Sequence, residues 1–440
     1  MLGKSVLLAV LAALTAVNAQ GEYLGFNYGA HKADGWTLKV HDDFLEEFQF
    51  AQKLAVNNGK FSSARLYTMI QGNEGDEPIE AIEAAIKTNT TLLLGMWCSI
   101  DPKYDPVGHV KKEISALKKA ITKYGSAFTD LVVGLSIGSE DLYRSSAMGI
   151  KNKSGIGAKA EEIVEFIGMV RKAIADTPLK GTPIGHVDTW TVWVDGSNRA
   201  VIDALDWIGF DGYPYFQSNM PNNSIEAAAD LFWESYEATR QAVSGKEVWI
   251  TETGWPVTGK DMGLASANVK EAQKYWNDIG CALFGNYKTW WYMLRDADPT
   301  PPEIEFGIVD AKFQPYYDLS CKNAKPSPSP VAVVSTSSAA PSTSAPASTS
   351  APSTRAPGMP TPDLSSYSTI DSSRSNTIAS TPTGSTYEIE SSTRDSGSPT
   401  NTAQTAAKTT GADAPSSGFA VKATIGLVAA QAIAVAFFLL

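Results

Sequence analysis

Two glutamates stand at the ends of short apolar runs, where an acidic residue is costly to bury. Glu252 ends the run 247–252 and precedes a Gly-Trp-Pro turn, and Glu140 closely follows the run 131–138. A buried carboxylate needs compensation, so we expect a functional reason for each. Two carboxyl groups that face each other are the pair that glycoside hydrolysis requires, one as acid/base and one as nucleophile.

The glutamates need a frame that brings them together. Short apolar runs alternate with helical segments, as strands buried on both faces do. The runs are 23–28, 63–67, 92–97, 131–138, 183–188, 207–211, 247–252 and 289–294. Eight such units in a body of about 300 residues predict an α/β fold, a (β/α)₈ TIM barrel. An open doubly wound sheet is the alternative, and the strand number and the lack of a nucleotide motif count against it.

Two helical segments have a clear apolar periodicity. Residues 42–59 place Phe44, Phe48, Ala51 and Ala55 on one face, and Asn58-Gly59 is expected to close that helix. Residues 158–176 predict a second amphipathic helix, with an apolar face made by Ile163, Phe166, Ile167, Val170 and Ile174.

In a TIM barrel the active site lies at the carboxyl ends of the strands. The fourth and seventh strands face each other across the ring, which places Glu140 and Glu252 over the same rim. We expect Arg65 and Tyr213 to donate hydrogen bonds that keep Glu252 ionised. Glu140, next to a like charge, is expected to stay protonated and to act as the acid.

The other rim residues suit a sugar. Flat aromatic rings pack against the C–H faces of a pyranose, and carboxylates and amides bind its hydroxyl groups. Trp255 is expected to form the floor of the sugar site, although core packing is the competing explanation for any one aromatic residue, Trp291 above all. The candidate substrate-binding residues are Asn27, Tyr28, Arg65, Tyr67, Ser139, Asp188, Asp211, Tyr213, Tyr215 and Trp255.

Charge and motif content argue against several functions. The net charge of −11 at pH 7 opposes contact with nucleic acid, which needs a basic face. Residues 155–160, GIGAKA, fit a dinucleotide-binding pattern, but no strand precedes them. Metal-binding spacings of histidine and cysteine are absent from the sequence, so we expect no metal and no cofactor. The chain is expected to act as a monomer.

The two ends of the chain read as targeting segments. Residues 1–19 have the pattern of a secretory signal peptide, with a membrane anchor as the alternative. Residues 322–411 are rich in Ser, Thr and Pro and predict a disordered, O-glycosylated linker. Residues 412–440 end in an apolar tail without a basic stop and predict a GPI-attachment propeptide, with a tail-anchored helix as the alternative. Gly411 is the first choice for the attachment site, followed by Ser416 and Ser417.

Cysteines and sequons fit a secreted protein. The three cysteines are an odd number, and we favour a disulfide between Cys281 and Cys321, which leaves Cys98 free. The expected N-glycosylation sites are Asn89, Asn152 and Asn222.

Several motifs together resemble glycoside hydrolase family 17, the β-1,3-glucanases. The segment WITETGWP around Glu252 is similar to the nucleophile signature of that family. Matches extend along the body as GFNYG, RLY, IGSE, GYPYF and PEIEFGI, and the tail resembles the fungal, wall-associated branch. The resemblance implies that Glu140 is the proton donor and Glu252 the nucleophile. Many members have Asn before the acid/base, where this chain has Ser139, which puts the contact to the sugar 2-hydroxyl in doubt.

The resemblance also implies an activity. We expect a retaining endo-β-1,3-glucanase that acts on β-1,3-glucan of a fungal cell wall and is held at the outer face of the plasma membrane by a GPI lipid. Glu303 and Glu305 would support the catalytic pair, or would be ordinary loop charges. A β-1,3-glucanosyltransferase with the same two glutamates is the alternative. A non-catalytic wall-binding protein would be expected to lack one of the glutamates, and both are present.

Overall fold

The computed structural model describes residues 23–32, 37–54, 56, 59–72, 75–296 and 303–324. Eight parallel strands pair in chain order and close into a barrel, so the predicted TIM barrel is confirmed. Each strand begins within one residue of the run predicted for it. The strands are β1 (Leu24–Tyr28), β2 (Ser63–Leu66), β3 (Thr91–Met96), β4 (Val132–Ser139), β5 (Ile184–Thr189), β6 (Trp207–Asp211), β7 (Glu247–Glu252) and β8 (Thr289–Trp291).

The last strand is shorter than predicted. It ends at Trp291 and not at Leu294. The carbonyl groups of Met293 and Leu294 accept a hydrogen bond from the N–H of Ile308, which lies in the segment after β8 and not in a neighbouring strand.

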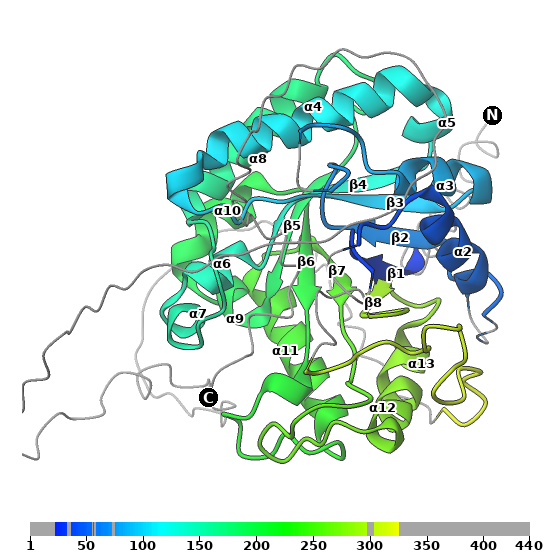
Figure 1. The fold of residues 1–440 in the computed structure, drawn as a ribbon. Helices are drawn as coiled ribbons and strands as arrows, with labels where there is room; N and C mark the ends of the chain where they lie inside the picture. The colour runs from blue at the N-terminus through cyan, green and yellow to red at the C-terminus, as the bar shows by residue number, and fades with distance from the viewer. Residues whose placement is uncertain are drawn as a thin grey trace, which may run out of the picture. The chain divides into compact units, whose positions relative to one another are not determined.

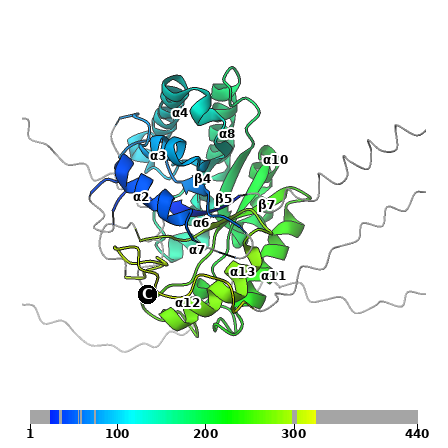
Figure 2. The same ribbon diagram turned by 90° about the vertical axis from the view of Figure 1, so that its right-hand side faces the viewer.

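Helices surround the strands on all sides, as Figures 1 and 2 show. A π-helix, Trp276–Gly280, joins the last two α-helices, and short 3₁₀ helices cover Pro102–Tyr104, Gly196–Asn198 and Pro214–Phe216. The α-helices are α2 (His41–Ala51), α3 (Ala81–Thr88), α4 (Pro106–Tyr124), α5 (Ser126–Thr129), α6 (Asp141–Ser145), α7 (Ala147–Lys151), α8 (Ala160–Ile174), α9 (Trp190–Trp193), α10 (Arg199–Ala204), α11 (Ala228–Ala242), α12 (Val269–Tyr275) and α13 (Cys281–Leu283).

The two helices predicted from periodicity both form, and both are shorter than predicted, α8 by two residues at each end and α2 by most of its second half. All five predicted apolar positions of α8 are buried. Helix α2 ends at Ala51, so the prediction that it reaches Asn58-Gly59 is wrong. After Ala51 the backbone hydrogen bonds span three residues instead of four, because Lys53 N–H donates to the carbonyl of Phe50 and Leu54 N–H donates to that of Ala51. The α-helix does not continue beyond this turn.

A layer of aromatic rings fills the barrel toward the amino ends of the strands. Trp207 and Trp249 stack with ring centroids 4.1 Å apart and an angle of 8° between the planes, and Trp290 packs beside them. Gly185 on β5 makes room for this layer, because a Cβ there would overlap the ring of Trp207. The apolar layer leaves the carboxyl end of the barrel as the place for the polar side chains.

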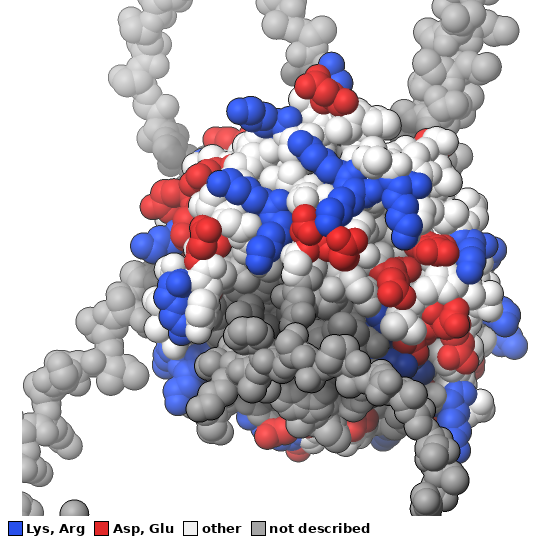
Figure 3. All heavy atoms as spheres, turned by 45° about the horizontal axis from the view of Figure 1, so that its top comes forward, with Lys and Arg blue, Asp and Glu red and all other residues white. Residues whose placement is uncertain are grey.

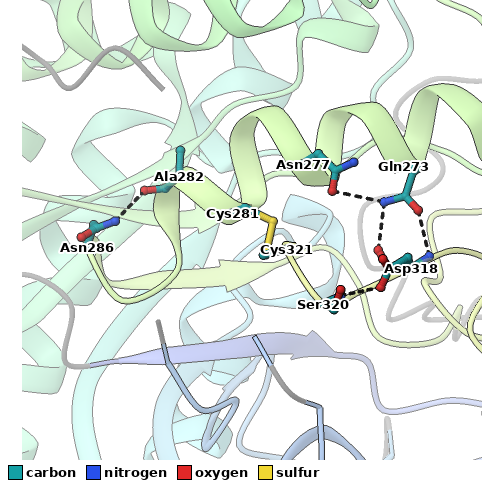
Figure 4. Close-up of a disulfide and its surroundings, with 8 residues drawn as sticks. All are labelled: Gln273, Asn277, Cys281, Ala282, Asn286, Asp318, Ser320 and Cys321. Atoms are coloured by element: carbon teal, nitrogen blue, oxygen red, sulfur yellow. Dashed lines mark hydrogen bonds between the residues drawn. A yellow bond between two sulfur atoms is a disulfide. The ribbon is translucent and has the colours of Figure 1, made fainter. Parts of the chain in front are cut away.

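The segment after β8 closes against α12 and α13. A disulfide joins Cys281 to Cys321, so the favoured pairing is confirmed (Figure 4). Gln273 on α12 bonds both backbone groups of Asp318, accepting its N–H at 2.8 Å and donating to its carbonyl at 2.9 Å. Cys98 is buried and free.

The described surface carries both signs of charge. In Figure 3, basic and acidic side chains lie side by side on the visible face. Lys119, for example, pairs with Asp76 at 2.7 Å and with Glu77 at 2.5 Å. The prediction that nucleic acid is not a partner stays a prediction.

The predicted targeting segments lie outside the described residues. This applies to the signal peptide 1–19, to the linker from residue 325 onward, and to the propeptide with Gly411. Within the described part, no helix is long and apolar enough to cross a membrane. Of the sequons, Asn89 and Asn222 are exposed, whereas Asn152 is half-buried and donates to the hydroxyl of Tyr143 at 3.1 Å.

Candidate active site

Glu252, the last residue of β7, receives three hydrogen bonds. Arg65 donates to Oε1 at 2.5 Å and Tyr67 donates to the same oxygen at 3.0 Å, while Tyr213 donates to Oε2 at 2.9 Å. The Glu252 side chain is 0% exposed. Burial and the adjacent Glu252 raise the pKa of both tyrosines well above its usual value, so they remain donors. Both donors expected from the sequence, Arg65 and Tyr213, make their contacts, and such donors stabilise a carboxylate in its charged form.

Arg65 connects three strands at the base of the site. Besides Glu252, its guanidinium donates to Asn27 Oδ1 on β1 at 2.7 Å and to Ser139 Oγ on β4 at 3.0 Å. Asn27 is held in turn, because its Nδ2 donates to the carbonyls of Thr251 and Trp290, each at 3.0 Å. Ser139 therefore supports Arg65 in this structure. Breaking a buried ion pair of this kind on one side typically costs about 3–5 kcal/mol.

Asp211 is the neighbour of Glu252 in the sheet. The two residues are paired in the register of β6 and β7, and Asp211 Oδ1 accepts from Thr251 Oγ1 at 2.8 Å. Its other oxygen is buried without a hydrogen-bond partner among the described residues. Burial, and then the charge of Glu252, raise the pKa of Asp211 well above its usual value. Burial thus favours a neutral Asp211. Arg65 then forms its ion pair with Glu252 alone of these two carboxyl groups.

Glu140 directly follows β4 and has the environment of an acid. Its backbone is left-handed, with φ 54° and ψ 25°, and its side chain is buried. Burial is the main cause that raises its pKa to about 8. Arg144 and Arg65 oppose the rise, and the charges of Glu252 and Asp188 add to it. Burial therefore favours the protonated form of Glu140, which is the form expected from the sequence.

The remaining predicted residues do not all reach the pair. Asp188 is buried, and its oxygens accept the N–H groups of Leu142, Tyr143 and Thr189 and contact His186. This places Asp188 under the start of α6 as a support. Tyr28 packs edge-on against Phe48, with ring centroids 4.9 Å apart. Their roles in substrate binding stay predictions.

Two predicted aromatic contacts serve the core instead. Trp255 is 1% exposed, its Nε1 donates to the carbonyl of Ser266 at 2.9 Å, and the rings of Tyr215 and Tyr275 lie against it. The prediction that Trp255 forms the floor of the sugar site is therefore wrong, because its ring is covered. Tyr215 is also buried, and its hydroxyl donates to the carbonyl of Lys260.

The acidic pair in the last loop lies beside the loop after β7. The backbone of Glu305 pairs with Val257 and Thr258 at 2.8 and 3.0 Å, and Glu303 is exposed. In the described part of the chain, neither carboxylate is hydrogen-bonded to Glu140 or Glu252, so the predicted support for the catalytic pair stays a prediction.

The sequence reasoning missed a buried network beside Glu140. It consists of Ser99 after β3 and of Asp141 and Arg144 on α6. The one signal for it was the spacing of Arg144, four residues after Glu140 and so one helical turn away.

The glycine pattern at 155–160 has a packing role. A Cβ on Gly157 would overlap the carbonyl oxygen of Asp141, so the residue permits a close approach to α6. Among the described residues, no group of three or more His, Cys, Asp or Glu side chains is placed to hold a metal ion. The expectation that the protein uses no cofactor stays a prediction.

Comparison with known proteins identifies the family. Residues 25–308 match the family described as the BtgE/BtgC glycoside hydrolase domain. The chain is also 54% identical over 314 residues to the probable glucan endo-1,3-beta-glucosidase eglC of Aspergillus fumigatus, across 71% of this chain and 68% of that one. A protein of the same name from Aspergillus oryzae is 52% identical over 314 residues, across 71% and 66%.

The chain belongs to the BtgE/BtgC glycoside hydrolase family. It is therefore a glycoside hydrolase, and the family 17 resemblance of its motifs is confirmed. The fold agrees with a solved structure described as a glycoside hydrolase family 17 beta-1,3-glucanosyltransferase from Rhizomucor miehei. That structure has a TM-score of 0.53 and 22% identity, across 68% of this chain and 97% of the other.

Proposed function

We propose that this member of the BtgE/BtgC glycoside hydrolase family is a retaining endo-β-1,3-glucanase that acts on the glucan of a fungal cell wall. One observation carries the proposal. Glu252 is held by three donors at the end of β7, while Glu140, after the opposite strand β4, has a pKa raised to about 8 by burial. A charged nucleophile and a protonated acid are the two states that the first step of a retaining mechanism needs.

The reaction follows from these two states. Glu252 attacks the anomeric carbon while Glu140 gives its proton to the glycosidic oxygen, and the bond between that carbon and oxygen breaks. Glu140 is then a carboxylate, and it takes a proton from a water molecule as the water attacks the same carbon. The bond to Glu252 breaks, and both glutamates return to their first states.

The choice of β-1,3-glucan rests on the relatives. The proteins of Aspergillus fumigatus and Aspergillus oryzae, at 54% and 52% identity, are both named as probable glucan endo-1,3-beta-glucosidases. Identity at this level over the catalytic body supports the same substrate class for this chain.

Product analysis tests the proposal. The full chain is incubated with reduced β-1,3-glucooligosaccharides and, separately, with β-1,4-linked ones of the same length, and Glu252→Gln serves as the inactive control. We expect shorter products from the β-1,3-linked substrates alone. Longer products would show that a sugar replaces water as the acceptor, and the enzyme would then be a transferase. A failure to convert β-1,3-linked substrates would overturn the proposal.

We further propose that the enzyme is bound to the outer face of the plasma membrane by a GPI lipid. The support is the signal pattern at 1–19 together with the small residues and apolar tail at 411–440. Phosphatidylinositol-specific phospholipase C should release activity from a membrane fraction. Activity that stays on the membrane while a known GPI protein is released would contradict this location.

A further inference from the structure

Helix α6 carries a buried arginine that faces the acid/base. Arg144 lies one turn after Glu140, and its Nη2 is 3.6 Å from Glu140 Oε2. This distance is longer than a hydrogen bond, and neither atom has a hydrogen-bond partner among the described residues. A shift of less than 1 Å would therefore turn the ion pair into a charge-assisted hydrogen bond of about 2.7–2.9 Å.

The rest of the guanidinium group is held in place. Arg144 Nη1 donates to the carbonyl of Ser139 at 2.5 Å and to Ser99 Oγ at 3.0 Å. The guanidinium carbon lies 5.2 Å from the centroid of the Trp97 ring, within the range of a cation–π contact. Arg144 is thus fixed from the loop after β3 and from the end of β4, and its free nitrogen points at Glu140.

The same network shapes the turn on which Glu140 stands. Ser99 donates to Asp141 Oδ1 and the N–H of Ser139 donates to Asp141 Oδ2, both at 2.6 Å. The left-handed backbone of Glu140 is uncommon for a residue with a side chain and needs such support. Gly138 fits only because it has no Cβ, which would overlap Asp141 Oδ2. Arg144 therefore contacts Glu140 in two ways: directly as an ion pair, and indirectly through its hydrogen bonds to Ser139 and Ser99, which hold the turn around Glu140.

We propose that Arg144 is a positioning residue for the reaction, which fixes the carboxyl group of Glu140 and compensates its negative charge after the proton has left. The inference rests on the proposed function. In the first step Glu140 loses its proton to the glycosidic oxygen and becomes a buried carboxylate. Arg144 keeps its own proton throughout, because a guanidinium is not deprotonated in proteins. In the second step Glu140 regains a proton from water, and the charge pair with Arg144 is lost again.

Other charges also face Glu140, and they set the background for a test. Arg65 from β2 is positive, while Asp188 from β5, Asp211 from β6 and Glu252 from β7 are acidic. Arg144 is the strongest of the influences that lower the pKa of Glu140, after burial, which raises it. An opposite charge at this range lowers the pKa of a carboxyl group by about 1–3 units. Removing the charge of Arg144 should therefore raise the pKa of Glu140 and shift the alkaline midpoint of the kcat/KM profile to higher pH.

The test compares pH profiles of kcat/KM for the full chain on a soluble β-1,3-glucooligosaccharide. Arg144→Met removes the charge, Arg144→Gln removes it but keeps a donor for the Ser139 carbonyl, and Arg144→Lys keeps the charge. We expect both neutral variants to raise the midpoint of the alkaline limb by about 1 unit or more and to lose activity at the optimum. The Arg144→Lys midpoint should stay near that of the wild type. Arg199→Met, an exposed arginine paired with Asp203 at the same helical spacing, is the matched control and should change neither.

The outcomes separate this inference from the proposed function. A wild-type enzyme that is inactive on the substrate would overturn the proposed function. An active wild type whose midpoint is unmoved in Arg144→Met and Arg144→Gln would overturn the inference alone, since a merely structural arginine lowers the rate without moving the limb. If Arg144→Met does not fold, as judged by circular dichroism, Arg144→Gln and Arg144→Lys give the same comparison.

Discussion

The two tyrosines that donate to Glu252 should differ in importance, although each loses only a hydroxyl group on substitution by phenylalanine. Among the described residues, Tyr213 is the sole hydrogen-bond donor to Oε2, whereas Tyr67 shares Oε1 with Arg65. Tyr213→Phe therefore leaves one oxygen of a buried carboxylate without a partner. Tyr67→Phe leaves Oε1 with the guanidinium of Arg65.

The size of the effect follows from the charge of the acceptor. A hydrogen bond to a charged group contributes about 1.5–3 kcal/mol. Each 1.36 kcal/mol corresponds to a factor of ten in rate, so Tyr213→Phe should lower kcat/KM by roughly 10- to 150-fold. Tyr67→Phe should cost clearly less, because the remaining donor to its oxygen is the stronger one.

The assay is the initial rate of oligosaccharide cleavage by full-length variants at the pH optimum. Tyr236→Phe is the control, because it removes the hydroxyl of a buried tyrosine on α11, a helix that carries no residue of the site. It should keep the wild-type rate. A larger loss for Tyr67→Phe than for Tyr213→Phe, or losses below twofold for both, would show that Tyr213 is not the more important donor to Glu252.

Three further predictions follow from the site and the fold. Because Glu140 must be protonated and burial raises its pKa to about 8, kcat/KM should fall only above about that pH. A fall that begins below pH 6 would show that burial does not raise the pKa of Glu140 in this way. Azide should restore activity to Glu252→Ala and give an α-glycosyl azide as product. With Glu140→Ala, on a substrate with a good leaving group, the product should be a β-glycosyl azide. If the two products are exchanged, the roles of the two glutamates are reversed. Cys281→Ser opens the bond to Cys321 and should lower the free energy of unfolding by about 2–5 kcal/mol, measured with urea; a loss below 0.5 kcal/mol would show that the segment is held by its other contacts.

The frame of the site could be predicted from the sequence because its signals are local. The strands of a closed parallel barrel are buried on both faces, so they stand out as apolar runs. A glutamate that ends such a run, as Glu252 does, is then visible as an exception. Arg65 could be named as its partner because a buried carboxylate needs a cation or donors nearby.

The aromatic residues could not be placed in the same way. Trp255 follows a strand end, and from the sequence alone its ring could face a ligand or the core. The answer depends on how Tyr215, which follows β6, and Tyr275, the last residue of α12, pack over the ring. These contacts join residues far apart in the chain.

The network around Arg144 was hidden for a related reason. Its parts come from the loop after β3 and from helix α6, and only the barrel brings Ser99 to Asp141 at 2.6 Å. The spacing of Arg144 from Glu140 indicated at most a helical pair. That the guanidinium is fixed by Ser139 and Trp97 is a property of the three-dimensional structure.

The stereochemistry of the first product distinguishes a double displacement through Glu252 from a single displacement by water. A soluble β-1,3-glucooligosaccharide is cleaved by the wild-type enzyme, and proton NMR records the anomeric signals before mutarotation mixes them. Attack by Glu252 followed by attack of water inverts the anomeric carbon twice, so we expect the β anomer to appear first. An initial α anomer would mean a single displacement by water, and it would contradict the assignment of Glu252 as nucleophile and Glu140 as acid/base.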